Sequence, residues 1–304
     1  MIKPLYILWK FSRPHTIIGS VVSIVTLWLL ALKNDVYTLY IDVLLLTLLA
    51  GVTCNIFIVG LNQIIDVELD KINKPNLPLA DGSLTMSGGH LIIWTSLGIS
   101  LITALFAGPI LGMLIIVICL IGIAYSVPPI QLKKHHLPAA LSITIVRGIL
   151  VNAGMFLHFS YASGQVAWQD ILTTPLQVFT NELWILMGFV IAFSIAIAWF
   201  KDLPDTVGDA RYQFKTLALV YSPKTALYGG VFLVFSAYIF AIYSLFVGGN
   251  DLLLYCHVIA AILFLVNVGY VKLNSPASVT RFYLIFWVFF FAEYIFFAAW
   301  ALID

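Results

Sequence analysis

The chain has little charge. Of its 304 residues, 14 are Asp or Glu and 15 are Lys or Arg, so charged side chains make up 10% of the total. Soluble domains carry about 25%. Apolar residues reach 62%. This composition excludes an ordinary soluble domain and indicates a helical integral membrane protein. The formal net charge of +1 gives no reason to expect a nucleic-acid partner.

Cysteine is scarce as well. Cys54, Cys119 and Cys256 each lie inside an apolar run, without metal-ligand spacing or an obvious pairing. We therefore interpret them as small apolar core residues. The stretch Met1–Pro4 begins neither a cleavable signal peptide nor a Ser/Arg-rich transit segment, so we expect the first span to be a permanent helix.

Long apolar runs dominate the chain. A hydrocarbon core of about 30 Å needs about 20 apolar helical residues. Nine runs meet this requirement, so we expect an all-α integral membrane protein with nine transmembrane helices, forming a single domain over residues 1–304. The expected spans are roughly 15–32, 41–65, 91–107, 110–127, 137–159, 183–200, 226–247, 252–271 and 282–303.

The positions of Lys and Arg predict the orientation. With nine spans, the N-terminus and the loops after spans 2, 4, 6 and 8 share one side of the membrane. Lys33 lies on the opposite side and Arg147 lies inside span 5. This asymmetry predicts a cytoplasmic N-terminus. The cations on the expected cytoplasmic side are Lys3, Lys10, Arg13, Lys71, Lys74, Lys133, Lys134, Lys201, Arg211, Lys215, Lys224, Lys272 and Arg281.

Two acidic clusters stand at the ends of apolar runs. The windows 62–70 and 201–209 hold six of the 14 acidic residues. They follow expected spans 2 and 6, which run parallel, so both clusters fall on the same side. The match between them predicts two related halves, about 1–135 and 136–304, that face one cavity.

Helical spacing gathers the carboxylates of each cluster. Asn62, Asp66 and Asp70 are spaced i, i+4 and i+8, which predicts one stripe along a helix. The second cluster has the spacing i, i+3 and i+7, again on one face. It consists of Asp202, Asp205 and Asp209.

Facing stripes of carboxylates suit a hard divalent cation. Mg²⁺ takes oxygen ligands and is commonly held by one or two carboxylates together with substrate phosphates. Lys74, Lys133 and Lys201 lie near the clusters and can bind phosphate through charge-assisted hydrogen bonds. The pattern indicates a metal–diphosphate site at the membrane boundary. Solvated loop ends are the alternative explanation for either cluster taken alone.

The residues also resemble a known family. The pattern Asn62-Gln63-x-x-Asp66-x-x-x-Asp70, followed by Asn-Lys-Pro-Asn-Leu-Pro over 73–78, resembles the first aspartate motif of the UbiA-type intramembrane prenyltransferases. Within that family it is most similar to the homogentisate prenyltransferases, and among these to the cyanobacterial homogentisate phytyltransferases. Further similar stretches are Phe11–Gly19, Tyr125–Lys133, Arg147-Gly148 with Val151-Asn152, and Lys201–Asp205 with Gly208-Asp209.

The resemblance implies nine transmembrane helices around a central cavity. It also implies Mg²⁺-dependent transfer of a prenyl group, phytyl in first place, from its diphosphate to homogentisate with decarboxylation, as in tocopherol or plastoquinone biosynthesis. The expected setting is a cyanobacterial inner or thylakoid membrane, with the active site on the cytoplasmic face. The catalytic and metal-binding residues expected are Asp66, Asp70, Asp202, Asp205 and Asp209. Those expected to bind diphosphate or substrate are Asn62, Lys74, Tyr125, Lys133, Arg147, Asn152 and Lys201.

Some alternatives stay open. Geranylgeranyl or solanesyl diphosphate can replace the phytyl donor, and chlorophyllide can replace the acceptor. An organic-anion or metal transporter is the alternative from another class, although its charges are expected near the midplane. Outside the clusters, we expect His158 at the far membrane interface and Glu293 in a helix–helix contact.

Overall fold

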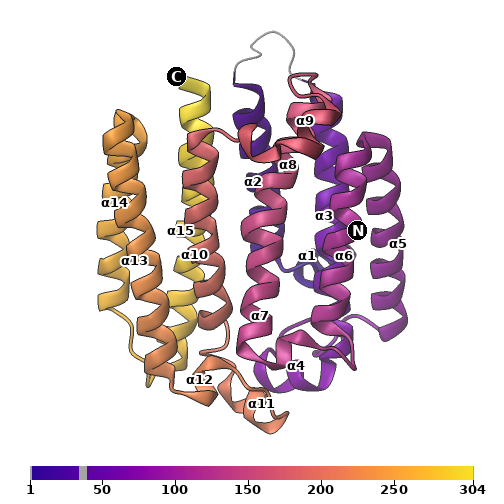
Figure 1. Ribbon diagram of the computed structural model, residues 1–304. Helices are drawn as coiled ribbons and strands as arrows, with labels where there is room; N and C mark the ends of the chain where they lie inside the picture. Colours follow the sequence, from indigo (N-terminus) through magenta and orange to yellow (C-terminus); the bar gives the residue numbers. More distant parts are fainter. Residues whose placement is uncertain (1, 34–39, 304) are drawn as a thin grey trace.

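Long apolar helices make up most of the described part of the chain. The computed structural model describes residues 2–33 and 40–303, and nine helices of this part are long and apolar enough to span a membrane (Figure 1). All nine predicted spans are therefore confirmed, and every span except 41–65 is shifted at one or both ends. They are α2 (Pro14–Leu32), α3 (Ile41–Ile65), α5 (Met86–Ala107), α6 (Pro109–Ser126), the α7–η2–α8 unit (His136–Ala162), α10 (Asn181–Phe200), α13 (Pro223–Gly248), α14 (Asp251–Gly269) and α15 (Pro276–Ile303).

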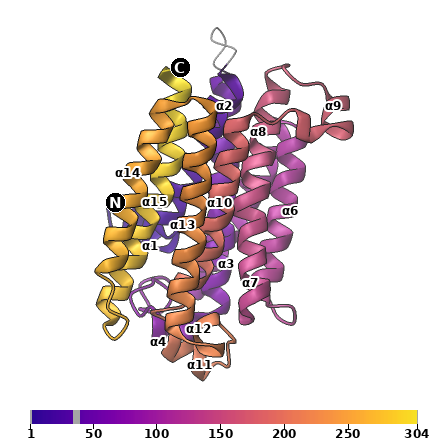
Figure 2. The ribbon, with the colours of Figure 1, turned by 60° about the vertical axis from the view of Figure 1, so that its left-hand side comes forward.

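Short helices connect the spans. In Figures 1 and 2, α4, α11 and α12 lie together at one end of the bundle, whereas α9 lies at the other end. The spans α3, α6, α10 and α14 all end on the side of α4 and α11. The short elements are α1 (Ile2–Phe11), α4 (Val67–Asn73), η1 (Leu132–Lys134), α9 (Trp168–Thr173), η3 (Pro175–Gln177), α11 (Thr206–Arg211) and α12 (Leu217–Val220).

Capping residues explain where several spans begin. The Thr85 hydroxyl accepts a hydrogen bond from the Gly88 N–H at 3.1 Å, so α5 begins five residues before the expected position 91. Pro14 and Pro109 occupy the first positions of α2 and α6, where a missing N–H costs nothing.

The fifth span is not a regular α-helix. Between α7 (His136–Ile143) and α8 (Val151–Ala162), the segment Thr144–Leu150 winds as the π-helix η2 and contains Arg147. Wide turns of this kind occur mainly at functional sites. The apolar run gave no indication of it.

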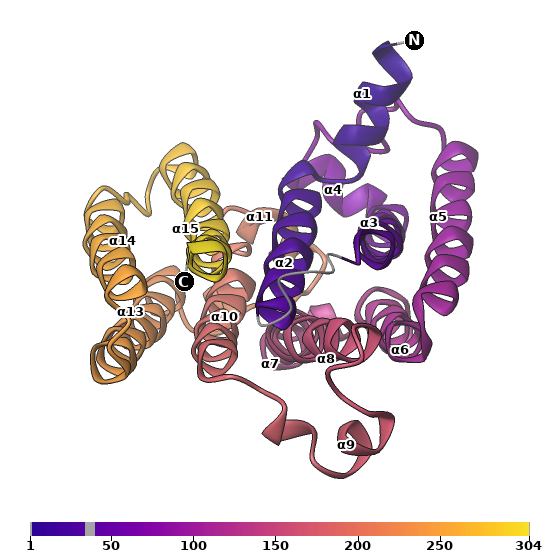
Figure 3. The same cartoon turned by 90° about the horizontal axis from the view of Figure 1, so that it is seen from above.

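The spans form two groups. Seen from above, α10, α13, α14 and α15 lie together, and α2, α3, α5, α6 and α7–α8 form the other group (Figure 3). Packed aromatic rings join α10 to α15, where Phe193 stacks on Phe286 with ring centroids 4.6 Å apart. The division into related halves at about residue 135 stays a prediction.

Two polar residues inside spans have specific partners. His158 is 1% exposed, and its Nε2 lies 3.0 Å from the Thr47 hydroxyl, whereas its expected position at the far membrane interface stays a prediction. A neighbouring helix supplies this partner, which a single apolar run does not reveal. The helix–helix contact expected for Glu293 is confirmed, because its Oε2 lies 3.0 Å from His257 Nε2 on α14.

The contact between α13 and α10 yields a prediction. A Cβ added to Gly230 would lie 2.5 Å from Cζ of the fully buried Phe200, whereas the nearest atom to a Cβ on Gly229 is 3.5 Å away. We expect Gly230→Ala to cost about 1–3 kcal/mol through overpacking. Thermal unfolding in detergent measures the effect, with Gly229→Ala as the control. Equal melting temperatures for the two variants would contradict this packing.

Candidate active site

A cavity of about 710 Å³ opens between the spans at the end that carries α4 and α11. Residues of α2, α3, α6, η2 and α15 line its walls, and residues of α4 and α11 lie at its mouth. It brings together eleven of the twelve residues predicted from the sequence. These are Asn62, Asp66, Asp70, Lys74, Tyr125, Lys133, Arg147, Lys201, Asp202, Asp205 and Asp209.

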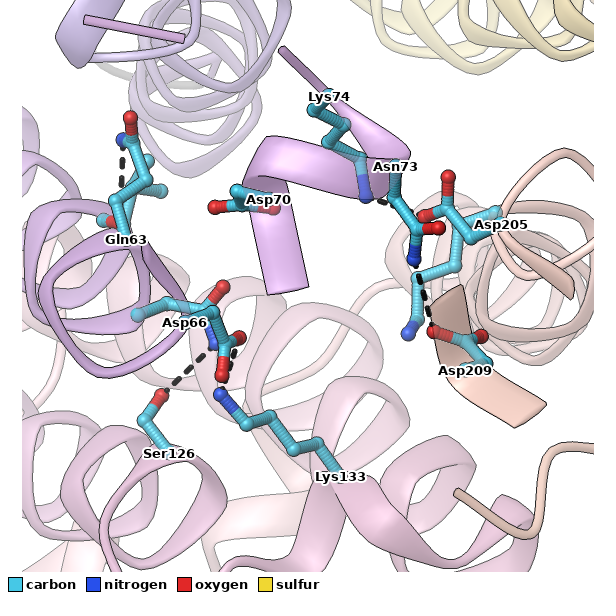
Figure 4. Close-up of polar contacts among 12 residues, drawn as sticks. Gln63, Asp66, Asp70, Asn73, Lys74, Ser126, Lys133, Asp205 and Asp209 are labelled. Atoms are coloured by element: carbon cyan, nitrogen blue, oxygen red, sulfur yellow. Dashed lines mark hydrogen bonds and ion pairs between the residues drawn. The ribbon is translucent and has the colours of Figure 1, made fainter. Parts of the chain in front are cut away.

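The first acidic cluster does not continue one helix. The span α3 ends at Ile65, and Asp66 stands between α3 and α4 with φ −103° and ψ 15°. The prediction of a continuous stripe through Asn62, Asp66 and Asp70 is therefore wrong. A straight continuation of α3 would carry Asp70 beyond the bundle. The break at Asp66 instead turns α4 so that Asp70 faces the cavity (Figure 4).

The second cluster is also divided. The span α10 ends at Phe200, and a turn containing Pro204 leads to α11, which starts at Thr206. Asp202 lies in the turn, Asp205 directly precedes α11, and Asp209 lies within it. The single helical face predicted for these three residues is wrong, because proline has no N–H to continue the helix. All three carboxylates nevertheless line the same cavity.

Almost every carboxylate has a cationic partner. Lys133 Nζ lies 2.5 Å from Asp66 Oδ2, Lys201 Nζ lies 2.8 Å from Asp202 Oδ1, and Lys74 pairs with Asp205. Arg13 lies 3.8 Å from Asp70 Oδ2. Asp209 has no such cation among the described residues and instead accepts a hydrogen bond from the Asn73 amide at 3.1 Å (Figure 4).

These cations do not fully offset the burial of negative charge. Burial, with the charges of Asp202 and Asp205, raises the pKa of Asp209 to about 7. Burial also raises the pKa of Asp70 and of Asp202. Burial opposes the charged form of Lys201, but the charges of Asp202, Tyr125 and Asp209, with the hydrogen bond to Asp202, together raise the pKa of that lysine. The carboxylates at the mouth of the cavity therefore favour the binding of a further cation.

The carboxylates fit a divalent cation in their chemistry. Asp70 Oδ2 is buried and has no hydrogen-bond partner, so one oxygen is available as a ligand. All five aspartates offer hard oxygen donors, which Mg²⁺ prefers. Within residues 2–33 and 40–303, no three Asp, Glu, His or Cys side chains already form a metal site. Lysines pair with Asp66, Asp202 and Asp205, so a metal that binds these carboxylates must displace the lysines.

Arg147 lies deep in the cavity wall. Its guanidinium lies 4.7 Å from the ring centroid of Trp287 and 5.4 Å from that of Phe290. It forms no ion pair with a carboxylate in the described part of the chain. It also lines a second cavity of about 200 Å³. An intramembrane arginine that lies over aromatic rings, and that pairs with no carboxylate of the described residues, is suited to an anionic ligand.

Asn152 is the one predicted residue that the structure keeps apart from both cavities, as far as residues 2–33 and 40–303 define them. It is fully buried, and its amide donates to the carbonyls of Arg147 and Gly148 at 2.9 and 3.0 Å. The Tyr294 hydroxyl donates to its Oδ1 at 2.9 Å. Asn152 thus holds the π-helical segment that carries Arg147 and ties it to α15.

Two cavity residues were missed as site candidates. Arg13 reaches Asp70 from a left-handed backbone position just before Pro14. Asn73 contacts α11 through its side chain. Both belong to stretches quoted for the family resemblance, so the sequence contained them without indicating their contacts.

Lys133 yields a test of the charge balance. Its side chain is 4% exposed, so Lys133→Met leaves the Asp66 carboxylate buried without its cation. We expect a loss of about 3 kcal/mol of stability without metal, and a larger stabilisation by Mg²⁺ than in the unmodified protein. Thermal unfolding with and without Mg²⁺ measures both effects. Lys134→Met, at the exposed neighbouring position, is the control, and identical behaviour of the two variants would refute the pairing.

Comparisons with known proteins agree with this geometry. The family model described as the UbiA prenyltransferase family matches residues 21–292. The chain is 37% identical over 295 residues to the homogentisate phytyltransferase of Synechocystis sp., covering 94% of this chain and 92% of that protein. It is 33% identical to the homogentisate geranylgeranyltransferase of Triticum aestivum, covering 96% and 72%, and 33% identical to the homogentisate solanesyltransferase of Arabidopsis thaliana, covering 95% and 75%.

Solved structures show the same fold. A UbiA homolog from Aeropyrum pernix superposes with a TM-score of 0.69 at 18% identity, covering 93% of this chain and 97% of that one. A UbiA homolog from Archaeoglobus fulgidus, bound to GPP and Mg²⁺, superposes with a TM-score of 0.62 at 15% identity, covering 96% and 99%.

Proposed function

The chain belongs to the UbiA prenyltransferase family, and we propose that it transfers a prenyl group from its diphosphate to homogentisate within the membrane. One observation carries the proposal. Five aspartates and four lysines from separate segments line one cavity, which also has apolar residues in its walls. This arrangement suits a substrate with a charged head and a long apolar tail.

The mouth provides the diphosphate site. Asp66, Asp70, Asp202, Asp205 and Asp209 would hold Mg²⁺, which when bound neutralises the diphosphate and makes it a better leaving group. A relative in fold is bound to GPP and Mg²⁺, which supports this choice of metal. Lys74, Lys133 and Lys201 donate hydrogen bonds to phosphate oxygens, with Asn62 beside them on α3.

The deeper walls protect the prenyl cation. As the bond between the prenyl carbon and the diphosphate oxygen breaks, an allylic cation forms that water would quench. Ile58, Ile118 and Val146 line the cavity and exclude water. Tyr125 and Tyr283 present aromatic side chains to the same space, where ring faces stabilise positive charge.

Arg147 binds the acceptor in this scheme. Its guanidinium has no carboxylate partner among the described residues and pairs with the carboxylate of homogentisate. The electron-rich ring then attacks the allylic cation, after the diphosphate has departed, and forms a carbon–carbon bond. Loss of the proton from the attacked ring carbon restores the arene. The side-chain carboxylate leaves as CO₂, and the CH₂ carbon that carried it takes up a proton. Asn152 acts indirectly, because its amide donates a hydrogen bond to the backbone carbonyl of Arg147 and so positions that residue.

Phytyl diphosphate is the donor we propose, since the Synechocystis relative is named a homogentisate phytyltransferase. The product would then belong to tocopherol or plastoquinone-type biosynthesis. The protein is an integral, multi-pass membrane protein. We place its active site on the cytoplasmic face of a cyanobacterial inner or thylakoid membrane, because the cationic loops share the side of α4 and α11.

An assay in membranes tests the proposal. Labelled homogentisate is offered with phytyl, geranylgeranyl or solanesyl diphosphate, with Mg²⁺ or with a chelator. We expect prenylated, decarboxylated product from phytyl diphosphate, and none after chelation. Product formation without any divalent metal, or no product with any donor, would refute the mechanism.

Substitutions in the clusters test the site. We expect Asp66→Ala and Asp205→Ala each to lower kcat/KM by roughly 10²-fold or more, because each removes an electrostatic contact to the metal–diphosphate. Glu68→Ala is the matched control, since Glu68 lies on α4 two residues after Asp66, is 69% exposed and pairs with Lys71. If both aspartate variants kept the control's activity, the assignment of the clusters would be wrong.

A further inference from the structure

We propose that Asn73 is a positioning residue that clasps α4 to α11 and sets the separation of the two aspartate clusters. The inference rests on the proposed function, because it concerns how the metal–diphosphate site is assembled. Asn73 is the last residue of α4, and its partners lie 135 and 136 positions later in the chain.

Both ends of the Asn73 amide are used. Oδ1 accepts a hydrogen bond from the Gly208 N–H at 3.0 Å. Nδ2 donates to Asp209 Oδ1 at 3.1 Å (Figure 4). The first bond fixes the backbone of α11, and the second orients the carboxylate of Asp209, which is 5% exposed. One side chain from the first cluster thus aligns a carboxylate of the second.

The partner residue must be glycine for this approach. A Cβ added to Gly208 would lie 2.6 Å from Asn73 Cγ and 2.8 Å from Nδ2, and closer still to Oδ1. Real side chains do not approach one another so closely, so any residue larger than glycine displaces the amide. The contact therefore depends on both residues, so a substitution of either Asn73 or Gly208 tests it.

The α11 helix depends on contacts with other parts of the chain. The α11 helix has six residues, and Gln213 soon after it adopts φ 59°. A single short turn of helix is marginal without tertiary contacts. The hydrogen bonds from Asn73 supply such contacts where Asp209 must face the cavity.

The next residue has a different role. Lys74 pairs with Asp205, which directly precedes α11, so consecutive residues of the first segment contact both parts of the second. The Lys74 ammonium competes with a metal for that carboxylate, and it is attracted by diphosphate. The neutral Asn73 amide binds a main-chain N–H, for which neither metal nor phosphate competes. Lys74 therefore exchanges partners when ligand binds, whereas Asn73 keeps α11 in place.

The test uses Mg²⁺ with inorganic pyrophosphate as the probe. Thermal unfolding of the detergent-solubilised protein is recorded against Mg²⁺ concentration at fixed pyrophosphate, with Mg²⁺ alone as a second series. We expect Asn73→Ala and Gly208→Ala each to raise the half-saturating Mg²⁺ concentration by roughly 10- to 100-fold, the usual effect of losing a residue that orients a metal ligand. The milder Asn73→Ser variant is measured alongside, in case either alanine variant does not fold.

A double-mutant cycle separates the clasp from general damage. If Gly208 is required because of Asn73, the double alanine variant binds about as weakly as either single variant rather than showing the product of both effects. In turnover assays, we expect KM for the prenyl diphosphate to rise, whereas KM for homogentisate stays unchanged. The controls are Gly98→Ala, whose Cβ meets no atom within 4 Å, and Asn274→Ala, at an exposed position before α15.

The outcomes distinguish the two proposals. If the unmodified protein is not stabilised by Mg²⁺ with pyrophosphate, the proposed function fails whatever Asn73 does. If the unmodified protein responds and the Asn73 variants respond at the same Mg²⁺ concentration, the clasp is refuted. A lower melting temperature with an unchanged Mg²⁺ requirement, or effects of the two alanine substitutions that simply multiply, would also refute it.

Discussion

The need to neutralise buried carboxylates at one end of a membrane bundle determines how the segments of this protein meet. A carboxylate removed from water is costly unless a cation or hydrogen-bond donor accompanies it. The partners come from distant parts of the chain, since Arg13 precedes the first span, Lys133 follows α6, and Lys74 follows α4. Each pair joins two segments, so electrostatic pairing arranges the mouth while apolar packing holds the spans.

The spans themselves could be predicted from the sequence, because length and apolarity are local properties. The span 41–65 was predicted with both ends correct, since Tyr40 and Asp66 interrupt the run on either side. The start of α5 was predicted too late in the chain, because Gly88, Gly89 and His90 interrupt the apolar pattern. The hydrogen bond from the Gly88 N–H to the Thr85 hydroxyl shows that the helix begins before them. Capping overrides hydropathy at such ends.

The internal geometry of the site could not be predicted in the same way. The aspartates line one cavity, as predicted, but the prediction assumed that each cluster continues a regular helix. The helices instead break at Asp66 and in the turn before Asp205. The spans are apolar on all sides, so the sequence does not define which face of a helix is buried. The partners of Asn152 and His158 were therefore not predicted, and the contacts of Asn73 depend on a residue 135 positions away.

The distance along the chain between α4 and α11 bears on biosynthesis. A nascent chain leaves the ribosome from its N-terminus. The cationic partners of Asp66 and Asp70 are Lys133 and Arg13, which lie in the first half of the chain. Asp205 pairs with Lys74, which is synthesised long before it. The first cluster is thus neutralised before the second exists. The finished α4 then serves as a template on which α11 docks, so the order of synthesis is also the order of assembly.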